Sequence, residues 1–508
     1  MGGGLSTALK KQKKALLRDV FGFDSFRPGQ EEMIDAILAG RDVVGIMPTG
    51  GGKSICYQLP ALMLPGITLV ISPLISLMVD QVQALVQLGV RGAYLNSSLS
   101  PKQLAKALSN ACSGMYKIIY LAPERLNTPG IQRLAECQPI SMVCVDEAHC
   151  ISQWGPDFRP SYLDIPAFVD GLPARPVVSA FTATATPRVQ EDIRNRLKLR
   201  DPLCTVTGFD RPNLYFQVQT PSDKFSALTA YLRRHAGQSG IIYCLTRREV
   251  ETVHQRLCEA GFSAVRYHAG LDQEEKAKSQ SDFIYDQVRL IVATNAFGMG
   301  IDKANVSFVL HYNLPRDIES YYQEAGRAGR NGKPADCILF YSQKDVRLNQ
   351  FMIEQASGES ASDAKSRAAL QNQEKLRLAQ MVRYAATADC LGNTILDYFG
   401  EKRTEPCGHC SNCLAAERAH RIAEGTRAKV RKTDGREQRL LSALYEERAR
   451  QARRSGVSPD SVFNDAALQE MAEKRPKNSF QLLQITGVTL SKSRKYGSAF
   501  LRVISNSK

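Results

Sequence analysis

The sequence has no hydrophobic run long enough to cross a membrane, and its first residues contain no apolar segment typical of a signal peptide. A transmembrane helix needs about 20 consecutive apolar residues, and residues 1–14 combine glycine and lysine without the apolar centre of a secretory signal. These absences exclude membrane-spanning and secreted classes of protein. We therefore expect a cytoplasmic protein without a membrane partner, associated with the nucleoid if the source is bacterial.

Acidic residues are too few to balance the basic ones. The chain carries 66 lysines and arginines against 51 aspartates and glutamates, a formal net charge of +15 at pH 7. Such an excess is typical of proteins that bind a polyanion such as nucleic acid, although a basic surface without such a partner gives the same count. At 508 residues the chain is long enough for about three domains, each with its own core.

The clearest motif is a glycine-rich loop at residues 47–54, with the sequence Met-Pro-Thr-Gly-Gly-Gly-Lys-Ser. Backbone N–H groups of such a loop can surround phosphates, while the lysine contacts the β- and γ-phosphates and the serine contacts Mg²⁺. Residues 42–47 are predicted to form a buried strand and residues 55–59 to open a helix, which fits this reading. A simple glycine-rich turn is the alternative, because Met47 replaces the glycine of the strict pattern. The predicted nucleotide-binding residues are Thr49, Gly50, Gly51, Gly52, Lys53 and Ser54.

A nucleotide also needs contacts for its base, and three side chains between residues 23 and 30 can supply them. Phe23 can stack on a ring, Arg27 can lie over it, and Gln30 has an amide that donates and accepts at once, as the edge of adenine requires. Residues 14–38 otherwise read as two helices around a turn, so helix capping is the alternative role.

Strand-then-helix units follow the loop, the pattern of a parallel sheet with helices on both faces. The strand predicted at residues 141–145 ends in Asp146-Glu147-Ala148-His149. Residues at the carboxyl ends of parallel strands lie where open α/β sheets bind ligands. We expect Asp146 to hold Mg²⁺ together with Ser54, and Glu147 to orient and polarise the attacking water.

Tryptophan occurs only once, at Trp154, in a loop of residues 150–160 that is rich in glycine and proline. Phe158 and Arg159 follow it closely in the sequence. Aromatic and arginine side chains beside an ATPase site can stack on single-stranded bases, so these three residues are candidate DNA contacts. In the alternative reading, Trp154 anchors the loop on the core.

The strand-and-helix pattern restarts after residues 208–213, but this second half contains no second Gly-Lys-Ser sequence. It therefore needs another role. Arg327 and Arg330 are three positions apart, which predicts that they share one helix face. An arginine supplied across a cleft to the γ-phosphate makes hydrolysis depend on closure of two domains. We expect Gln323, Arg327 and Arg330 to complete the ATP site from this half.

Most of the 13 cysteines stand singly in apolar segments, as reduced cysteines of a cytosolic protein do. One group of four differs, because its last three members are three positions apart, with two residues between successive cysteines. Four thiolates with such spacing can close a tetrahedral zinc site without an open position, which makes the metal structural. Chance clustering and a redox role are the alternatives, and no βαβ context supports the redox role. The predicted zinc ligands are Cys390, Cys407, Cys410 and Cys413.

The order and spacing of these motifs resemble those of RecQ-type DNA helicases of superfamily 2. The resemblance covers about residues 14–415 and is carried by FGFDSFRPGQ, MPTGGGKS, DEAH, SQWGPDFRP, TATATP, GFDRPN, FGMGIDK and QEAGRAGR. It implies an ATP- and Mg²⁺-dependent translocase that moves 3′ to 5′ on DNA and carries a zinc site of this cysteine spacing. Relatives share the methionine at position 47, whereas Pro156 departs from the histidine that is common there.

Beyond the cysteines, residues 416–433 read as a basic linker, and residues 434–508 resemble the helical helicase-and-RNase-D C-terminal (HRDC) domain. Lys492, Arg494 and Lys495 at a helix start could contact DNA phosphates or belong to a purely structural helix cap. In most full-length relatives a winged-helix domain stands between the zinc site and this bundle, and here only the linker does. We infer that the winged helix is absent, which predicts weaker unwinding or another strand-separating element.

The expected fold is α/β, with two tandem RecA-like parallel-sheet lobes, a helical zinc-binding subdomain and a small all-α bundle. The predicted domains are residues 1–208 (first lobe, ATP-binding), 209–345 (second lobe), 346–415 (zinc-binding subdomain), 416–433 (linker) and 434–508 (HRDC-like domain).

The expected function is that of an ATP-dependent 3′-to-5′ DNA helicase in recombination or repair, with ATP, Mg²⁺ and Zn²⁺ as ligands. We expect a monomer that binds single-stranded DNA and tailed or forked duplexes, with single-strand-binding or recombination proteins as candidate partners. One alternative is a DNA-stimulated ATPase, translocase or annealing protein with weak unwinding, because the winged helix is missing. A second, a DNA-binding scaffold with an ATPase switch, is opposed by the presence of Glu147 and Arg330. RNA as the substrate is compatible with the motifs, but the resemblance favours DNA.

Overall fold

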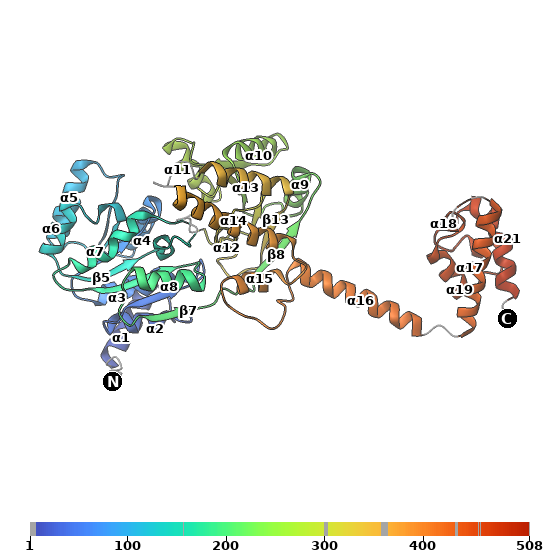
Figure 1. The fold of residues 1–508 in the computed structure, drawn as a ribbon, viewed down its shortest axis with the longest axis horizontal. Coiled ribbons are helices and arrows are strands. Elements are labelled where there is room, and N and C mark those ends of the chain that lie inside the picture. Colours follow the sequence, from blue (N-terminus) through green and yellow to red (C-terminus); the bar gives the residue numbers. More distant parts are fainter. Residues whose placement is uncertain are drawn as a thin grey trace. The chain divides into compact units, whose positions relative to one another are not determined.

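The chain forms two compact units, residues 1–414 and 415–508, in this computed structural model (Figure 1). The structure describes residues 7–155, 157–298, 303–356, 364–431, 435–455, 457 and 459–506. Pro156, the departure from the family pattern, lies outside these ranges. Within them, no helix has both the length and the apolarity that crossing a membrane requires.

The first sheet has seven parallel strands in the order β3-β4-β2-β5-β6-β1-β7. Its strands are β1 (Val43–Ile46), β2 (Ile67–Ile71), β3 (Gly92–Leu95), β4 (Ile118–Leu121), β5 (Ile140–Val145), β6 (Val177–Thr182) and β7 (Leu203–Val206). Its helices are α1 (Thr7–Asp19), α2 (Gln30–Leu38), α3 (Lys53–Met63), α4 (Ile75–Gln87), α5 (Pro101–Cys112), α6 (Pro129–Cys137), α7 (Ile165–Asp170) and α8 (Pro187–Arg196). Short 3₁₀ turns η1 (Pro123–Arg125), η2 (Ala148–Ile151) and η3 (Pro160–Asp164) complete this lobe.

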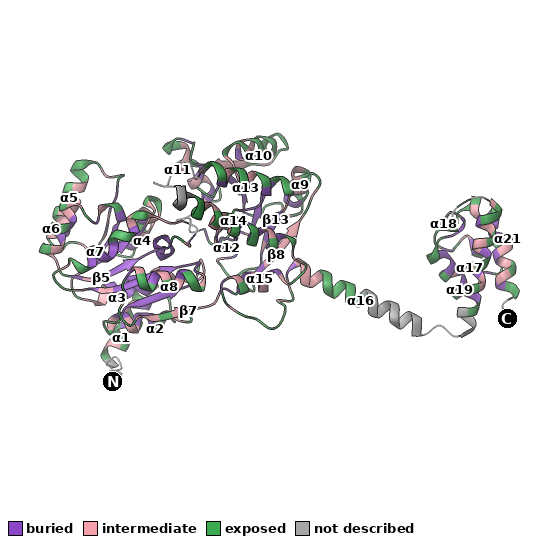
Figure 2. Ribbon diagram, viewed as in Figure 1, coloured by how far each residue is buried: buried purple, intermediate pink, exposed green. Residues whose placement is uncertain are grey.

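The central strands of this sheet are apolar on both faces because helices cover both sides, and Figure 2 shows β5 buried, whereas the edge strand β7 is partly exposed. Alternate residues of a strand point to opposite faces. In β5, Cys144 belongs to the core cluster that contains α2, α3 and α4, whereas Val143 and Val145 belong to the cluster that contains α6, α7 and α8. Parallel strands covered in this way carry continuous apolar runs, which is why the sequence predicted them.

The second sheet has six parallel strands in the order β10-β11-β9-β12-β13-β8. Its strands are β8 (Leu214–Gln219), β9 (Gly240–Tyr243), β10 (Ala264–Tyr267), β11 (Leu290–Ala293), β12 (Phe308–His311) and β13 (Ala335–Phe340). Its helices are α9 (Lys224–Arg234), α10 (Arg247–Glu259), α11 (Gln273–Ile284) and α12 (Ile318–Ala325). Two parallel-sheet lobes in tandem confirm the predicted fold class.

A helical region follows the second sheet, with α13 (Gln343–Ala356), α14 (Ala364–Ala386), α15 (Leu391–Tyr398) and α16 (Ser411–Arg431). It packs on the second lobe through aromatic rings, and Phe399 stacks on Phe209 with centroids 4.4 Å apart. The predicted basic linker, residues 416–433, needs a correction, because α16 continues through it as far as Arg431. Alanine, arginine, lysine and glutamate dominate this stretch and favour helix.

The second unit contains a helical bundle made of α17 (Gly435–Ser455), α18 (Pro459–Val462), α19 (Asp465–Lys474), α20 (Ser479–Leu482) and α21 (Leu490–Asn506). Its core brings apolar side chains of α17, α19 and α21 together, and the rings of Phe463 and Phe500 meet edge to face at 4.9 Å. The all-α bundle predicted for this part of the chain is confirmed. Lys492, Arg494 and Lys495 lie in the first turns of α21, as predicted.

Candidate active site and metal centre

The predicted nucleotide loop joins β1 to α3 at the carboxyl edge of the first sheet. Gly52 directly precedes Lys53, the first residue of α3, and has a backbone φ of +85°. A side chain at this position would be strained, and its Cβ would lie 2.5 Å from Nε2 of Gln30. The left-handed turn therefore favours glycine here, and any side chain would also have to displace the Gln30 amide.

Six successive carbonyl oxygens of this loop, from residue 47 to residue 52, each accept a hydrogen bond. Two of the donors belong to the motif, and three side chains reach it from outside. The bonds run from Lys53 Nζ to Met47 (3.3 Å), from the N–H of Gly51 to Pro48 (2.9 Å), from Arg211 to Thr49 (3.1 Å), from Arg27 to Gly50, and from Gln30 to Gly51 (3.4 Å) and Gly52 (3.1 Å). Such bonds fix the loop before a ligand arrives, which lowers the cost of binding phosphates through its N–H groups.

The residues predicted around the base, Phe23, Arg27 and Gln30, line the same cavity as the loop. Phe23 is 46% exposed, so its ring is accessible for stacking. Gln30 is buried and uses both ends of its amide, since Oε1 accepts from the N–H of Arg27 (2.8 Å) while Nε2 donates to the loop. Gln30 therefore combines a local backbone contact, similar to the capping role considered as the alternative, with a position beside the nucleotide loop.

Asp146 and Glu147 directly follow β5 and lie at the same edge of the sheet as the loop. Both are buried, and Glu147 has a φ of +48° that turns the chain into η2. Burial, followed by the neighbouring Glu147 carboxylate, raises the pKa of Asp146 to about 7, with Lys53 opposing the rise. Burial also lowers the pKa of Lys53. The two carboxyl groups and Ser54 line the same cavity and offer the oxygen ligands that Mg²⁺ prefers. A cation would also relieve the repulsion between the carboxylates, so these residues fit Mg²⁺.

A chain of polar contacts connects this strand end to the next strand. Nδ1 of the buried His149 lies 2.8 Å from Oγ1 of Thr182 and 3.3 Å from Oε2 of Glu147. Thr182 ends β6 and donates to the carbonyl oxygen of Thr184 (3.2 Å). The candidate water-positioning residue is thus connected to a second strand end through His149, to which the sequence alone assigned no role.

A cavity of about 590 Å³ between the two lobes collects the candidate residues of both. From the first lobe it is lined by the base-binding candidates, by the loop and by both acidic residues, and from the second lobe by the three residues predicted to complete the site. These lining residues are Phe23, Arg27, Gln30, Thr49, Gly50, Gly52, Lys53, Ser54, Asp146, Glu147, Gln323, Arg327 and Arg330. The cavity is also lined by Tyr57, Asp80 and Gln81, which the motifs did not indicate.

The two arginines do not share one helix face, contrary to the prediction. α12 ends at Ala325, and Arg327 and Arg330 follow in a glycine-containing turn. Gly326 is the C-cap of α12, and Gly329 in the turn that follows has a φ of +59°, a conformation that glycine adopts most easily. The turn lies against the nucleotide loop, because Cγ of Arg330 is 3.4 Å from the position that a Cβ of Gly50 would take.

The tryptophan loop is held by arginines from two other elements. The guanidinium of Arg188 lies over the ring of Trp154, 3.0 Å from its centroid, and Arg377 of α14 donates to the Trp154 carbonyl. Arg159 donates to a backbone carbonyl just after β2 (2.9 Å). Trp154 packs against the core and is half-buried, and Phe158 is half-buried as well. The buried part of the Trp154 ring therefore anchors the loop, which was the alternative role predicted for it.

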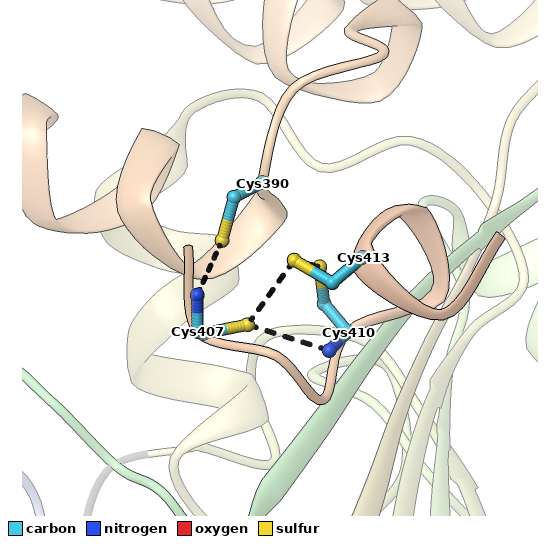
Figure 3. Close-up of side chains that lie close together, drawn as sticks. All are labelled: Cys390, Cys407, Cys410 and Cys413. Atoms are coloured by element: carbon cyan, nitrogen blue, oxygen red, sulfur yellow. Dashed lines mark hydrogen bonds between the residues drawn. The ribbon is translucent and has the colours of Figure 1, made fainter. Parts of the chain in front are cut away.

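The four predicted zinc ligands converge on one point, and Figure 3 shows their sulfur atoms turned toward one another. All four Sγ atoms lie within 4.8 Å of one another. Sγ of Cys407 is 3.9 Å from Sγ of Cys413, close to the ~3.8 Å expected for two thiolates on a tetrahedral zinc ion with Zn–S bonds of about 2.3 Å. Backbone N–H groups of Cys407 and Cys410 donate to the sulfurs of Cys390 (3.2 Å) and Cys407 (3.3 Å), which favours the thiolate form. The cluster therefore fits zinc.

Four family models match successive parts of the chain. They are DEAD/DEAH box helicase (residues 27–193), helicase conserved C-terminal domain (residues 223–332), RecQ zinc-binding (residues 343–414) and HRDC domain (residues 437–504). The first two each fall on one parallel sheet, the third contains the cysteine cluster, and the fourth falls on the helical bundle.

Similar proteins include the ATP-dependent DNA helicase RecQ of Bacillus subtilis, which is 38% identical over 587 residues that cover 97% of this chain and 98% of the relative. The protein of the same name from Pasteurella multocida is 39% identical over 498 residues, 97% of this chain and 74% of the relative. The first alignment is longer than the 508 residues of this chain, so part of that relative has no counterpart here.

Among solved structures, the Mycobacterium smegmatis helicase Lhr bound to single-stranded DNA and AMP-PNP is similar with a TM-score of 0.53 and 19% sequence identity. The similarity covers 73% of this chain and 57% of that chain. At 19% sequence identity, this similarity supports the fold alone.

Proposed function

The chain belongs to the RecQ family of helicases, and on that premise we propose how its residues couple ATP hydrolysis to DNA unwinding. It is an ATP-dependent DNA helicase of the RecQ type, and we propose that it moves 3′ to 5′ on single-stranded DNA in recombination or repair. The cavity shared by the nucleotide loop and the arginine turn carries the proposal. A site divided between two lobes is complete only when the lobes are together, so turnover can drive one lobe against the other.

In the first lobe, the loop N–H groups and Lys53 bind the phosphates, and the cavity residues Phe23, Arg27 and Gln30 hold the adenine. Ser54 and Asp146 would hold Mg²⁺, which when bound neutralises charge on the transferred phosphoryl group. Glu147 accepts a hydrogen bond from the attacking water and orients it. The burial of both carboxyl groups and their position beside Lys53 support these assignments.

In the second lobe, Arg327 and Arg330 stabilise the charge that develops on the γ-phosphate, and Gln323 lies with them in the cavity. Because these residues come from the other side of the cavity, separation of the lobes would remove them from the phosphate. We also propose zinc as a structural ligand of the four-cysteine cluster, which ties α15 to the start of α16.

The tryptophan loop is the proposed contact to DNA, through Trp154, Phe158 and Arg159. It follows the acidic residues in sequence and contacts α14 through Arg377, which supports a role in relaying the state of the ATP site. We propose that the protein acts as a monomer on single-stranded DNA and tailed duplexes, with single-strand-binding or recombination proteins as partners. The proposed domain boundaries are 208/209, 345/346, 415/416 and 433/434, although α16 crosses the third boundary and continues through residues 416–431 of the predicted linker.

The alternative of a translocase or annealing protein with weak unwinding is not favoured. Relatives named as DNA helicases align with 97% of this chain, including both lobes and the region that follows them. The residues between the zinc-binding and HRDC matches, 415–436, are too few for a winged-helix domain, so we propose that strand separation relies on the lobes and the described helical regions.

Strand separation on a duplex with a 3′ single-stranded tail tests the proposed direction, with a 5′-tailed duplex of the same sequence as the control. ATP and Mg²⁺ should permit release of the strand only from the 3′-tailed duplex, because a 3′-to-5′ translocase loaded on that tail runs into the duplex. Release from the 5′-tailed duplex alone would contradict the direction, and release from neither would contradict the helicase activity.

A further inference from the structure

Arg211 lies in the segment between the two sheets, after β7 and before β8, and uses all five of its N–H donors on protein acceptors. Nε donates to the side chain of Asn213, and the two terminal nitrogens donate to four backbone carbonyls. The accepting atoms are Asn213 Oδ1 (3.4 Å) and the carbonyl oxygens of Thr49 (3.1 Å), Gly326 (3.4 Å), Ala328 (3.1 Å) and Gly329 (3.2 Å).

These acceptors belong to both lobes. Thr49 is part of the nucleotide loop, whereas the three other carbonyls belong to the turn that carries Arg327 and Arg330. One planar guanidinium thus touches both parts of the proposed ATP site, and its rigid fork fixes the distance between them more tightly than a flexible ammonium would.

The backbone segment that carries Arg211 is fixed by the contacts of Phe209, two residues earlier in the chain. The carbonyl of Phe209 accepts from the hydroxyl of Tyr322 (2.7 Å), its N–H donates to the Glu401 carboxylate (2.7 Å), and its ring stacks on Phe399. The segment is therefore fixed to α12 and to the zinc-binding region, and it belongs with the second lobe. The bond from Arg211 to Thr49 thus connects the second lobe to the nucleotide loop of the first lobe.

We propose that Arg211 is a positioning residue that holds the nucleotide loop against the arginine turn, so that Arg330 faces the loop when ATP is bound. The inference rests on the proposed function and deepens it. A purely structural reading would make Arg211 a cap for the carbonyls that follow α12. That reading accounts for three of the bonds but not for the one to Thr49, which contributes nothing to the end of α12.

The test compares Arg211→Ala and Arg211→Lys with a matched control, Asn213→Ala, in the full chain. Asn213 Nδ2 donates to the carbonyls of Gly329 and Lys333 (both 2.9 Å), and its Oδ1 accepts from Arg211 Nε, so its loss weakens the same turn and removes one bond of Arg211 while the bond from Arg211 to Thr49 remains. Arg211→Ala should lower the DNA-stimulated kcat for ATP by about 10- to 100-fold, with a smaller change in KM. Arg211→Lys should recover only part of the loss, since an ammonium cannot span five acceptors, and Asn213→Ala should stay close to wild type.

A second arm combines Arg211→Ala with Arg330→Ala and monitors thermal unfolding of every variant. If Arg211 acts through Arg330, the double variant should be hardly slower than Arg330→Ala alone. Independent, multiplying losses would overturn the inference, as would a loss of kcat in Asn213→Ala equal to that in Arg211→Ala. A wild-type chain without DNA-stimulated hydrolysis would refute the proposed function, whereas an active wild type with an unimpaired Arg211→Ala variant would refute this inference alone.

Discussion

Gln30 contacts the nucleotide loop through backbone carbonyls, with Nε2 3.1 Å from the oxygen of Gly52, and it lines the cavity that Phe23 also lines. If Gln30 served only to cap α2, its hydrogen bonds would be confined to the start of that helix. The additional bonds to the loop mean that binding of a base next to this amide and the conformation of the phosphate-binding backbone depend on the same side chain.

Gln30→Ala should therefore lower kcat/KM for ATP by about 10- to 100-fold and reduce the preference for ATP over GTP. The variant removes the amide that is proposed to contact adenine, and it also removes two hydrogen bonds to the nucleotide loop. Steady-state hydrolysis of both nucleotides in the presence of single-stranded DNA measures this directly. The ratio of the two kcat/KM values is the internal control. If the rate falls while the ratio stays at the wild-type value, Gln30 supports the loop but does not read the base.

Several important contacts of the site could not be read from the sequence. The motifs indicated Lys53 and Arg330, because their residue types and spacing carry a chemical pattern. They did not indicate the roles of Arg211 and His149, because the partners of Arg211 are mainly backbone carbonyls and that of His149 is the Thr182 hydroxyl on another strand. A backbone carbonyl leaves no mark in the sequence, so such partners appear only when the fold brings distant segments together.

At the scale of elements, strands were the most predictable part of the fold. Sheets covered on both faces require continuous apolar runs, and the run at residues 141–145, which was predicted to be a strand, lies within β5. Helix ends were harder to predict. Glycines ended α12 before its two arginines, while a run of good helix formers extended α16 into a stretch that charge alone suggested to be a tether.

The zinc-binding element gives a prediction about metal content and stability. Cys407→Ser removes one of the four thiolates, and a three-thiolate site should bind zinc far less tightly, so the variant should retain little zinc and unfold at a lower temperature. Metal analysis of the purified protein and thermal unfolding check this. The control is Cys137→Ser, an exposed cysteine of α6 that should leave both properties unchanged. A wild-type chain that is free of zinc and fully stable would show that the cluster is not a zinc site.

At the scale of the whole molecule, the sequence predicted the order of the parts because each part carries its own motif or periodicity. We propose that the winged helix is absent, since only residues 415–436 separate the zinc-binding and HRDC matches. The alignment with the Bacillus subtilis relative is longer than this chain, so part of that relative has no counterpart here. The cavity between the lobes could only be inferred, because its walls come from segments that are distant in the sequence.

We propose that hydrolysis in this divided site drives strand separation. It is tested by measuring ATP hydrolysis and strand release in the same reaction on a 3′-tailed duplex, for the wild type and for Glu147→Gln. We expect the wild type to perform both, while Glu147→Gln still binds ATP but loses turnover by about 100-fold or more and releases no strand. Strand release by Glu147→Gln at the wild-type rate, or hydrolysis by the wild type without any release, would contradict it.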